Sequence, residues 1–186
     1  MRHVVGRNLC PHVLRALGFV VLSLYVGLAM PTGALAAGTE PAQIDIPKIG
    51  TSATVVPLGM DANGFMQAPD DPDTVGWFQP GVKLGVPGNV LLNGHADWGG
   101  QLRVFGLLHR LQPGDTLQIT TTDGDVLSFE VVWTRLYDAQ TAPLDEIFEQ
   151  TSVQEVTLIT CGGTFDPAIH MYLSRWVVRG IRSDAR

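Results

Sequence analysis

Glu155-Val-Thr-Leu-Ile-Thr-Cys-Gly-Gly163 has the pattern of a buried β-strand that ends at a thiol. The residues before Cys161 are apolar or β-branched, as is typical of a strand inside a protein core. A cysteine at the end of such a strand is held by a rigid element, and the two glycines after it leave room for a substrate backbone. Cys161 is therefore a candidate nucleophile. The alternative is a structural cysteine that packs as a small apolar residue.

Stretches of the same kind recur along the chain. Short β-branched or alternating runs are separated by Gly, Pro, Asn and Asp, and Asp123-Gly124 between two of them is a hairpin-turn signal. Helical patterns are confined to Leu102–His109 and to a short turn at Leu144–Phe148. We therefore predict a mainly β fold, a closed barrel or a sandwich, and no parallel βαβ sheet. The predicted strands are Ile44–Ile46, Thr54–Pro57, Val90–Asn93, Thr116–Thr121, Val126–Leu136, Glu155–Thr160 and Arg175–Ile181.

The composition is that of a globular protein with a short appendage. The chain has 186 residues, of which 45% are hydrophobic and 16% charged, and its formal net charge is -6. Binding to nucleic acid needs a surplus of Lys and Arg on some face, and this sequence has none. Peptides, sugars or small molecules are the partners that an acidic domain favours.

The N-terminus has the pattern of a targeting segment. Arg2, Arg7 and Arg15 precede an apolar run at Ala16–Met30, and Ala34-Leu-Ala36 is a possible cleavage site. Continued to residue 37, the apolar run is long enough for an uncleaved membrane anchor. We assign residues 1–37 to a signal peptide or N-terminal anchor, 38–43 to a linker and 44–182 to one folded, exported domain.

The cysteine count points to a free thiol. Of the two cysteines, Cys10 lies in the basic leader, so the folded domain keeps Cys161 alone and forms no internal disulfide. Exported proteins favour paired cysteines, and a single one forms an intermolecular disulfide or is a reactive thiol.

His95 is the histidine that we select as a partner for the thiol. It follows the predicted strand that ends at Asn93, with Gly94 between, and the open loop 96–100 after it is a possible access rim. For His109 and His170 an ordinary packing or surface role is the better interpretation.

Arg175 begins the last predicted strand. Strand alternation puts Arg175 and Val177 on one face, which we expect to point inward. A fixed guanidinium there can donate to a developing oxyanion and to a substrate carbonyl. Solvent-exposed positions are expected for Arg179 and Arg182.

Taken together, these residues resemble the catalytic pattern of the sortases. Gly94-His95, Leu158-Ile-Thr-Cys161 and Arg175 before a hydrophobic strand match that family in kind, order and spacing, and Leu-x-Thr-Cys at a strand end is the most specific part. The similarity covers nearly all of the chain from Ile44 to Gly180. It includes Ile46–Gly50, Asp70–Trp77 and Leu111–Asp115. Among the branches of the family, the chain resembles classes E and F most.

The resemblance implies a closed barrel of about eight strands with short helices. It also implies a cysteine transpeptidase that cleaves an LPXTG-like sorting signal and joins the acyl product to an amine. Cys161 would attack the Thr-Gly carbonyl, and His95 would act as general acid and then as base. Arg175 would hold the oxyanion and the signal peptide, with Thr160 as a minor substrate contact.

The resemblance further implies partners and a location. The substrates would be surface proteins with a C-terminal sorting signal, and the acceptor would be an amine of the cell wall or of another protein. The enzyme would be monomeric, need no cofactor or metal, and work outside the cytoplasm at the cell surface. Membrane contact would be through residues 16–37, if these are not cleaved. The acidic clusters of a calcium site are missing from the sequence, as is a second apolar anchor after Arg179.

Three rival interpretations remain open. An L,D-transpeptidase is also β-rich with Cys and His, but its Ser-His-Gly-Cys context is absent, because Ile159-Thr160 precedes Cys161. A catalytically inactive surface domain could bind peptides only, although all three candidate catalytic residues are present. A metal site built on Cys161 and His95 lacks further ligands, whereas structural zinc takes four.

Overall fold

The computed structural model describes residues 38–183. The predicted signal peptide or anchor at residues 1–37 lies outside the described residues. Within 38–183, no helix combines the length and the apolar composition needed to cross a membrane.

The described chain is mainly β-structure. Its helical elements are three short turns, η1 (Pro47–Ile49), η2 (Leu108–Arg110) and α1 (Leu144–Ile147). The strands are β1 (Pro41–Ile46), β2 (Thr51–Leu58), β3 (Val75–Phe78), β4 (Gly88–Asn93), β5 (Asp97–Trp98), β6 (Gln101–Leu102), β7 (Thr116–Thr121), β8 (Val126–Asp138), β9 (Gln154–Asp166) and β10 (Met171–Arg182).

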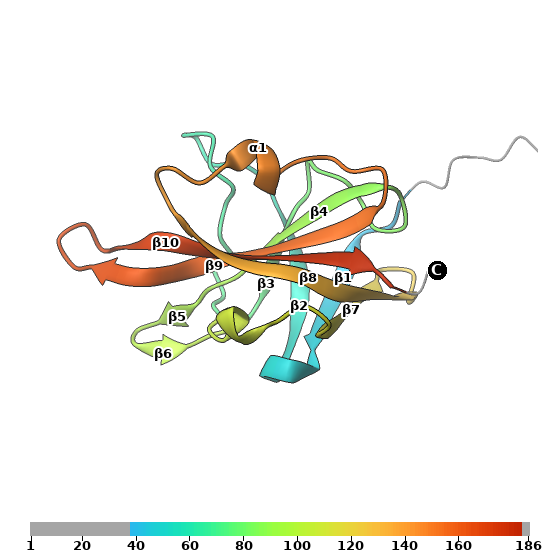
Figure 1. Ribbon diagram of the computed structural model, residues 1–186, viewed down its shortest axis with the longest axis horizontal. Coiled ribbons are helices and arrows are strands. Elements are labelled where there is room, and N and C mark those ends of the chain that lie inside the picture. The colour runs from blue at the N-terminus through green and yellow to red at the C-terminus, as the bar shows by residue number, and fades with distance from the viewer. Residues whose placement is uncertain (1–37, 184–186) are drawn as a thin grey trace, which may run out of the picture. The chain divides into compact units, whose positions relative to one another are not determined.

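Eight of these strands form a closed barrel in the order β1-β2-β3-β4-β9-β10-β8-β7, while β5 and β6 form a separate hairpin (Figure 1). β2 pairs with β3 and β4 pairs with β9 in parallel; the other pairs are antiparallel. The predicted mainly β fold with a closed barrel is thus confirmed. A sandwich, the alternative left by the strand pattern, is excluded because β1 pairs with β7 and closes the sheet.

Strand alternation fills the barrel with apolar side chains. On β9, Val156 and Leu158 are fully buried in the core, and on the neighbouring strands Leu92 and Val178 are too. The residues between them on these strands point to the outside of the barrel. Cys161 is an odd number of residues from Leu158 and therefore lies on the outer face.

The predicted helix at Leu102–His109 is wrong. Leu102 belongs to β6, a turn follows, and only Leu108–Arg110 forms a 3₁₀ turn. The amides of Arg103 and Phe105 donate to the carbonyls of Ala96 and His95, so this part of the segment pairs with the chain before β5 instead of forming the hydrogen bonds of an α-helix. A Cβ on Gly106 would lie 2.5 Å from the carbonyl oxygen of Ala96, which explains the glycine there. The second helical prediction, after Pro143, corresponds to α1.

Several boundaries also move. Residues 41–43, assigned to a linker from the sequence, belong to β1 and pair with β2 and β7. β3 was missed because Val75–Phe78 is a short, largely buried strand that lacks polar alternation. β7 has the predicted bounds, and Asp123-Gly124 forms the predicted turn into β8, with Gly124 at φ +91°.

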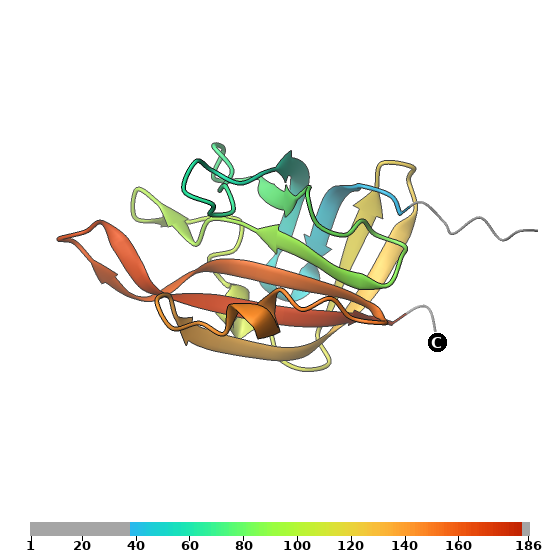
Figure 2. The ribbon, with the colours of Figure 1, turned by 90° about the horizontal axis from the view of Figure 1, so that it is seen from above.

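Two hairpins extend past the same end of the barrel, β5–β6 and the far parts of β9–β10 (Figures 1 and 2). A hydrogen bond from the Tyr172 hydroxyl to the Asp97 carboxylate joins them. In the other direction along β9 and β10, α1 crosses their outer face (Figure 2). The part of this face between α1 and the hairpins carries the candidate site.

Candidate active site

Cys161 and Arg175 are directly opposite partners in the antiparallel pairing of β9 with β10. Opposite residues in such a pair project from the same face of the sheet, with Cβ atoms about 5 Å apart. The structure therefore brings these two predicted residues together. The expectation that Arg175 points inward is wrong, however. On β10, which lies between β8 and β9 in the sheet, Val178 points into the core. Arg175 and Val177, at odd distances from Val178, therefore lie on the outside of the barrel.

His95 reaches the same region from β4. Asn93 pairs in parallel with Ile159, so His95 and Cys161 each follow this pair by two residues. The Gly94 amide extends the pairing by donating to the Ile159 carbonyl at 3.2 Å. The ends of two adjacent parallel strands thus carry the candidate histidine and the candidate thiol.

The imidazole of His95 is fixed on two sides. Its Nε2 lies 2.8 Å from the carbonyl oxygen of Pro69, and the Trp98 ring packs edge-on at a centroid distance of 5.0 Å. A carbonyl oxygen can only accept a hydrogen bond, so Nε2 carries the proton in this arrangement. In the neutral ring, Nδ1 is then the nitrogen that can take up a proton.

Thr160 connects the two strand ends. Its hydroxyl donates to the carbonyl oxygen of Gly94 at 2.7 Å, and its side chain is only 4% exposed. Thr160 points away from the outer face that carries Cys161, and its hydroxyl is engaged within the protein. The contact with substrate that the sequence suggested for Thr160 stays a prediction.

The glycines beside the candidate residues are explained by packing. A Cβ on Gly94 would lie 2.8 Å from the buried Phe105 ring, and one on Gly162 would lie 2.3 Å from the Trp176 ring. Gly163 has a φ of +74°, a backbone conformation that favours glycine, where the pairing of β9 and β10 shifts register. These positions need glycine for the fold, whereas the sequence had suggested room for a substrate backbone.

The thiol of Cys161 has an electrostatic environment of mixed sign. Partial burial raises its pKa, the Arg175 guanidinium lowers it, and the Asp97 carboxylate raises it. The hydrogen bond to Asp97 raises the pKa of Tyr172 to about 12, with smaller contributions from burial and from the charge of Asp97. Raised values favour the neutral thiol and the neutral phenol.

Arg175 is held by the backbone. Its Nη1 donates to the carbonyl oxygens of Tyr172 and Ser174, both at 2.8 Å. These two bonds fix the guanidinium beside Cys161 without using an acidic side chain. Because these bonds go to neutral carbonyls, they leave the positive charge of Arg175 uncompensated, and it is suited to attract a developing oxyanion.

Arg179 is buried, which corrects the expectation of a solvent-exposed side chain. It is 5% exposed and forms an ion pair with Glu155 at 2.5 Å. It also donates to the carbonyls of Glu146 and Ile147, the last two residues of α1. Arg182 is partly buried and donates to Gln154. Arg179 is therefore engaged in holding α1 against the barrel.

The other histidines have the packing roles expected of them. His109 lies 5.9 Å from the Trp176 ring, and His170 lies 6.5 Å from the Phe165 ring at the tip of the β9–β10 hairpin. Neither contact brings the ring to Cys161.

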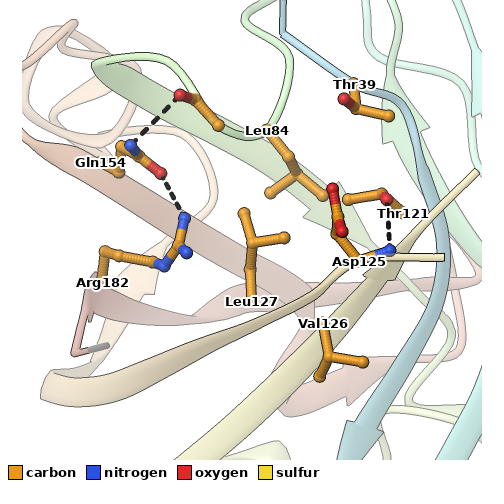
Figure 3. A pocket seen from close by; sticks show the side chains of 9 residues that line it. Thr39, Leu84, Thr121, Asp125, Val126, Leu127, Gln154 and Arg182 are labelled. Atoms are coloured by element: carbon orange, nitrogen blue, oxygen red, sulfur yellow. Dashed lines mark hydrogen bonds between the residues drawn. The ribbon is translucent and has the colours of Figure 1, made fainter. Parts of the chain in front are cut away.

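Two hollows of the surface lie elsewhere. One, of about 450 Å³, is lined by Asp125, Gln154 and Arg182 among others (Figure 3). Gln154 begins β9 and Arg182 ends β10, so this hollow is at the end of the barrel away from Cys161. The other, of about 340 Å³, lies between β2 and β6. The three candidate catalytic residues line neither hollow, and in residues 38–183 no group of three or more His, Cys, Asp or Glu side chains could hold a metal ion.

Sequence reasoning missed Asp97, Tyr172 and the carbonyl of Pro69. Asp97 lies in the loop noted as an access rim, and Gly99-Gly100, both with positive φ, form the two-residue turn of the β5–β6 hairpin. That Gly-Gly signal was available in the sequence. The approach of Tyr172 and Pro69 depends on segments distant along the chain, which no local pattern indicates.

The chain matches the model of one protein family. The family model of the sortase domain matches residues 44–183. No curated protein matches the chain significantly.

Solved structures share the fold. A lid mutant of sortase A from Corynebacterium diphtheriae is 22% identical, with a TM-score of 0.59 over 77% of this chain and 70% of that one. The sortase D5 transpeptidase of Clostridium perfringens is 22% identical, with a TM-score of 0.57 over 77% and 79%. Sortase C-1 of Actinomyces oris is 24% identical, with a TM-score of 0.57 over 76% and 71%. These matches are to classes A, C and D, and the class E or F assignment stays a prediction.

Proposed function

Because the chain belongs to the sortase family, whose members are cysteine transpeptidases, we propose that it cleaves an LPXTG-like sorting signal and transfers the acyl product to an amine. Cys161 is the proposed nucleophile, His95 the proton carrier and Arg175 the oxyanion-binding group. The observation that carries this proposal is the direct pairing of Cys161 with Arg175 on the face where the β4 end brings in His95.

In the acylation step, the Cys161 sulfur attacks the carbonyl carbon of the Thr-Gly bond. The Arg175 guanidinium, held by two backbone carbonyls, stabilises the charge on the carbonyl oxygen. The C–N bond breaks as protonated His95 gives its proton to the leaving amine. The product is a thioester on Cys161.

The second step reverses these roles. An incoming amine attacks the thioester carbon, neutral His95 takes the amine proton, and the C–S bond breaks to release Cys161. Because Nε2 keeps its proton to donate to the carbonyl oxygen of Pro69, Nδ1 is the atom that gives and takes the proton in both steps. The raised pKa of the thiol means that only a minor fraction of the free enzyme holds the reactive thiolate.

The face around the thiol suits an extended peptide. α1 and the buried Arg179–Glu155 ion pair cover one part of the outer face of β9 and β10. The neighbouring part, with Ile159 and Cys161, is only half-buried. An apolar, partly open strip that ends at a thiol fits the short apolar residues of a sorting signal.

We also propose that the enzyme acts at the cell surface on surface proteins, with residues 1–37 as its export signal or anchor. The arrangement of the leader in the sequence supports this, since Arg2, Arg7 and Arg15 precede the apolar run. Assignment to class E or F belongs to the same proposal.

The test uses the purified chain with a small library of LPXTG-like peptides and hydroxylamine. Hydroxylamine captures a thioester as a hydroxamate, which mass spectrometry identifies together with its site of cleavage. We expect a hydroxamate at the Thr of at least one peptide. Hydroxamate formation by Cys161→Ala, or cleavage that needs no thiol, would contradict the proposal.

A further inference from the structure

The β5–β6 hairpin carries a carboxylate into the neighbourhood of the candidate thiol. Asp97 is on β5, two residues after His95, and it accepts a hydrogen bond from the Tyr172 hydroxyl of β10. Arg175, which lies opposite Cys161, donates to the carbonyl oxygen of this same Tyr172, so the Tyr172–Asp97 bond lies beside the Cys161–Arg175 pair. The charge of Asp97 accordingly raises the pKa of the thiol. In residues 38–183, the ion pairs found do not include Asp97.

Two opposite charges therefore act on the thiol. Arg175 is directly across the β9–β10 pair, and Asp97 approaches from the β5–β6 hairpin. The positive charge of Arg175 stabilises the oxyanion that forms in acyl transfer. The carboxylate does not help the attack of the sulfur, because a negative charge nearby disfavours both the thiolate and the oxyanion.

A reaction partner with a positive charge gives this carboxylate a role. The acceptor of a transpeptidase is a primary amine, and both α-amino groups and lysine side chains reach the enzyme largely as ammonium ions at neutral pH. We propose that Asp97, held in place by Tyr172, is the acceptor-binding residue that recruits this primary ammonium group to the thioester on Cys161. This inference rests on the proposed function.

The chemistry of the step balances without a further reactant. The ammonium bound at Asp97 loses one proton to water and becomes an amine. Its nitrogen attacks the thioester carbon, the C–N bond forms and the C–S bond breaks. His95 takes the second proton from nitrogen and passes it to the departing sulfur, so that an amide and a free thiol result.

Two substitutions separate this role from a structural one. In Asp97→Asn the side chain keeps an oxygen that accepts from Tyr172 but loses its charge. In Tyr172→Phe the hydrogen bond is lost and the charge of Asp97 stays. If Asp97 serves only to tie the two hairpins together, Tyr172→Phe is the more damaging change. If the charge of Asp97 recruits the acceptor, Asp97→Asn is the more damaging change.

The experiment measures transfer by the full-length chain from an LPXTG-like peptide to three acceptors. Triglycine offers an α-ammonium, Nα-acetyl-lysine amide offers a side-chain ammonium, and hydroxylamine is uncharged at neutral pH. Asp97→Asn should lower transfer to the charged acceptors relative to hydroxylamine by about fivefold to tenfold, through a higher acceptor KM. The two charged acceptors show whether one source of ammonium is preferred.

The matched control is Asp123→Asn, a carboxylate in the β7–β8 turn that bonds to Thr39 at the other end of the barrel. It should leave the ratio of charged to uncharged acceptors unchanged. Raised salt should reduce the ratio in the parent chain and much less in Asp97→Asn.

The outcomes separate two failures. If no peptide gives a hydroxamate, the proposed function itself is wrong. If hydroxamate forms but Asp97→Asn keeps the parent's ratio, or loses all acceptors equally, the acceptor role of Asp97 is overturned. A larger loss of the ratio in Tyr172→Phe than in Asp97→Asn would also overturn it in favour of a purely structural bond.

Discussion

The Thr160 hydroxyl donates a 2.7 Å hydrogen bond to the carbonyl oxygen of Gly94. Thr160 precedes the candidate nucleophile and Gly94 precedes the candidate histidine, so one buried bond sets the spacing between the two strand ends. The bond lies beneath the outer face, because the Thr160 side chain is 4% exposed. Its contribution can therefore be tested by changing Thr160 without changing Cys161, His95 or Arg175.

Thr160→Val should slow transfer about tenfold to a hundredfold, mainly in kcat, because it leaves the Gly94 carbonyl without its partner and loosens the relation of His95 to Cys161. Thr160→Ser keeps the hydroxyl and should restore most of the rate. Steady-state kinetics with a cleaved sorting peptide measures both. A Ser variant as impaired as the Val variant would argue against positioning by the hydroxyl.

Cys161→Ala should abolish hydroxamate formation while the fold is kept, because Ala removes the sulfur but nearly preserves the volume. Mass spectrometry of products and the thermal unfolding midpoint measure the two effects. Turnover by the Ala variant would refute the assignment of the nucleophile.

Arg175→Lys should lose about a hundredfold or more of kcat/KM, although the positive charge is kept. An ammonium cannot reproduce the planar donor fork that the backbone carbonyls of Tyr172 and Ser174 hold in place. Rates with the same peptide give the loss. Near-parent activity would remove Arg175 from the oxyanion role.

Arg179→Ala should instead destabilise the fold by about 3 to 5 kcal/mol, because it leaves the largely buried Glu155 carboxylate without its partner and releases α1. Urea unfolding measures this free energy. In the same assay Arg175→Ala should have a much smaller effect. Equal unfolding of the two variants would contradict the separate roles of these arginines.

Iodoacetamide labelling of Cys161 should accelerate with pH to a midpoint above the ordinary pKa of a cysteine, because burial and Asp97 outweigh Arg175. Only the thiolate reacts, so a raised pKa moves the midpoint to higher pH. Asp97→Asn removes a negative charge and should lower the midpoint, whereas Arg175→Met should raise it. The rates are measured in the full-length chain with Cys10→Ser. Labelling that is complete and independent of pH down to about pH 5 would show a stable thiolate.

Much of the fold was available from local patterns. The strand at Thr116–Thr121 and the turn at Asp123-Gly124 are specified by alternation and turn chemistry, which depend only on neighbours in sequence. The helix expected at Leu102–His109 is absent because apolar spacing cannot show that the amides of Arg103 and Phe105 bond to the carbonyls of Ala96 and His95.

By itself, the sequence determined a β-rich chain, a lone thiol at a strand end, and the three candidate residues His95, Cys161 and Arg175. Only the tertiary structure decided that the last two are cross-strand partners on the outer face, because strand register depends on pairing between distant segments. It also decided that Arg179 is buried against Glu155, and that Asp97 meets Tyr172 beside the thiol. Local alternation fixes which residues share a face, but the closure of the barrel decides which face is inside and what covers the other one.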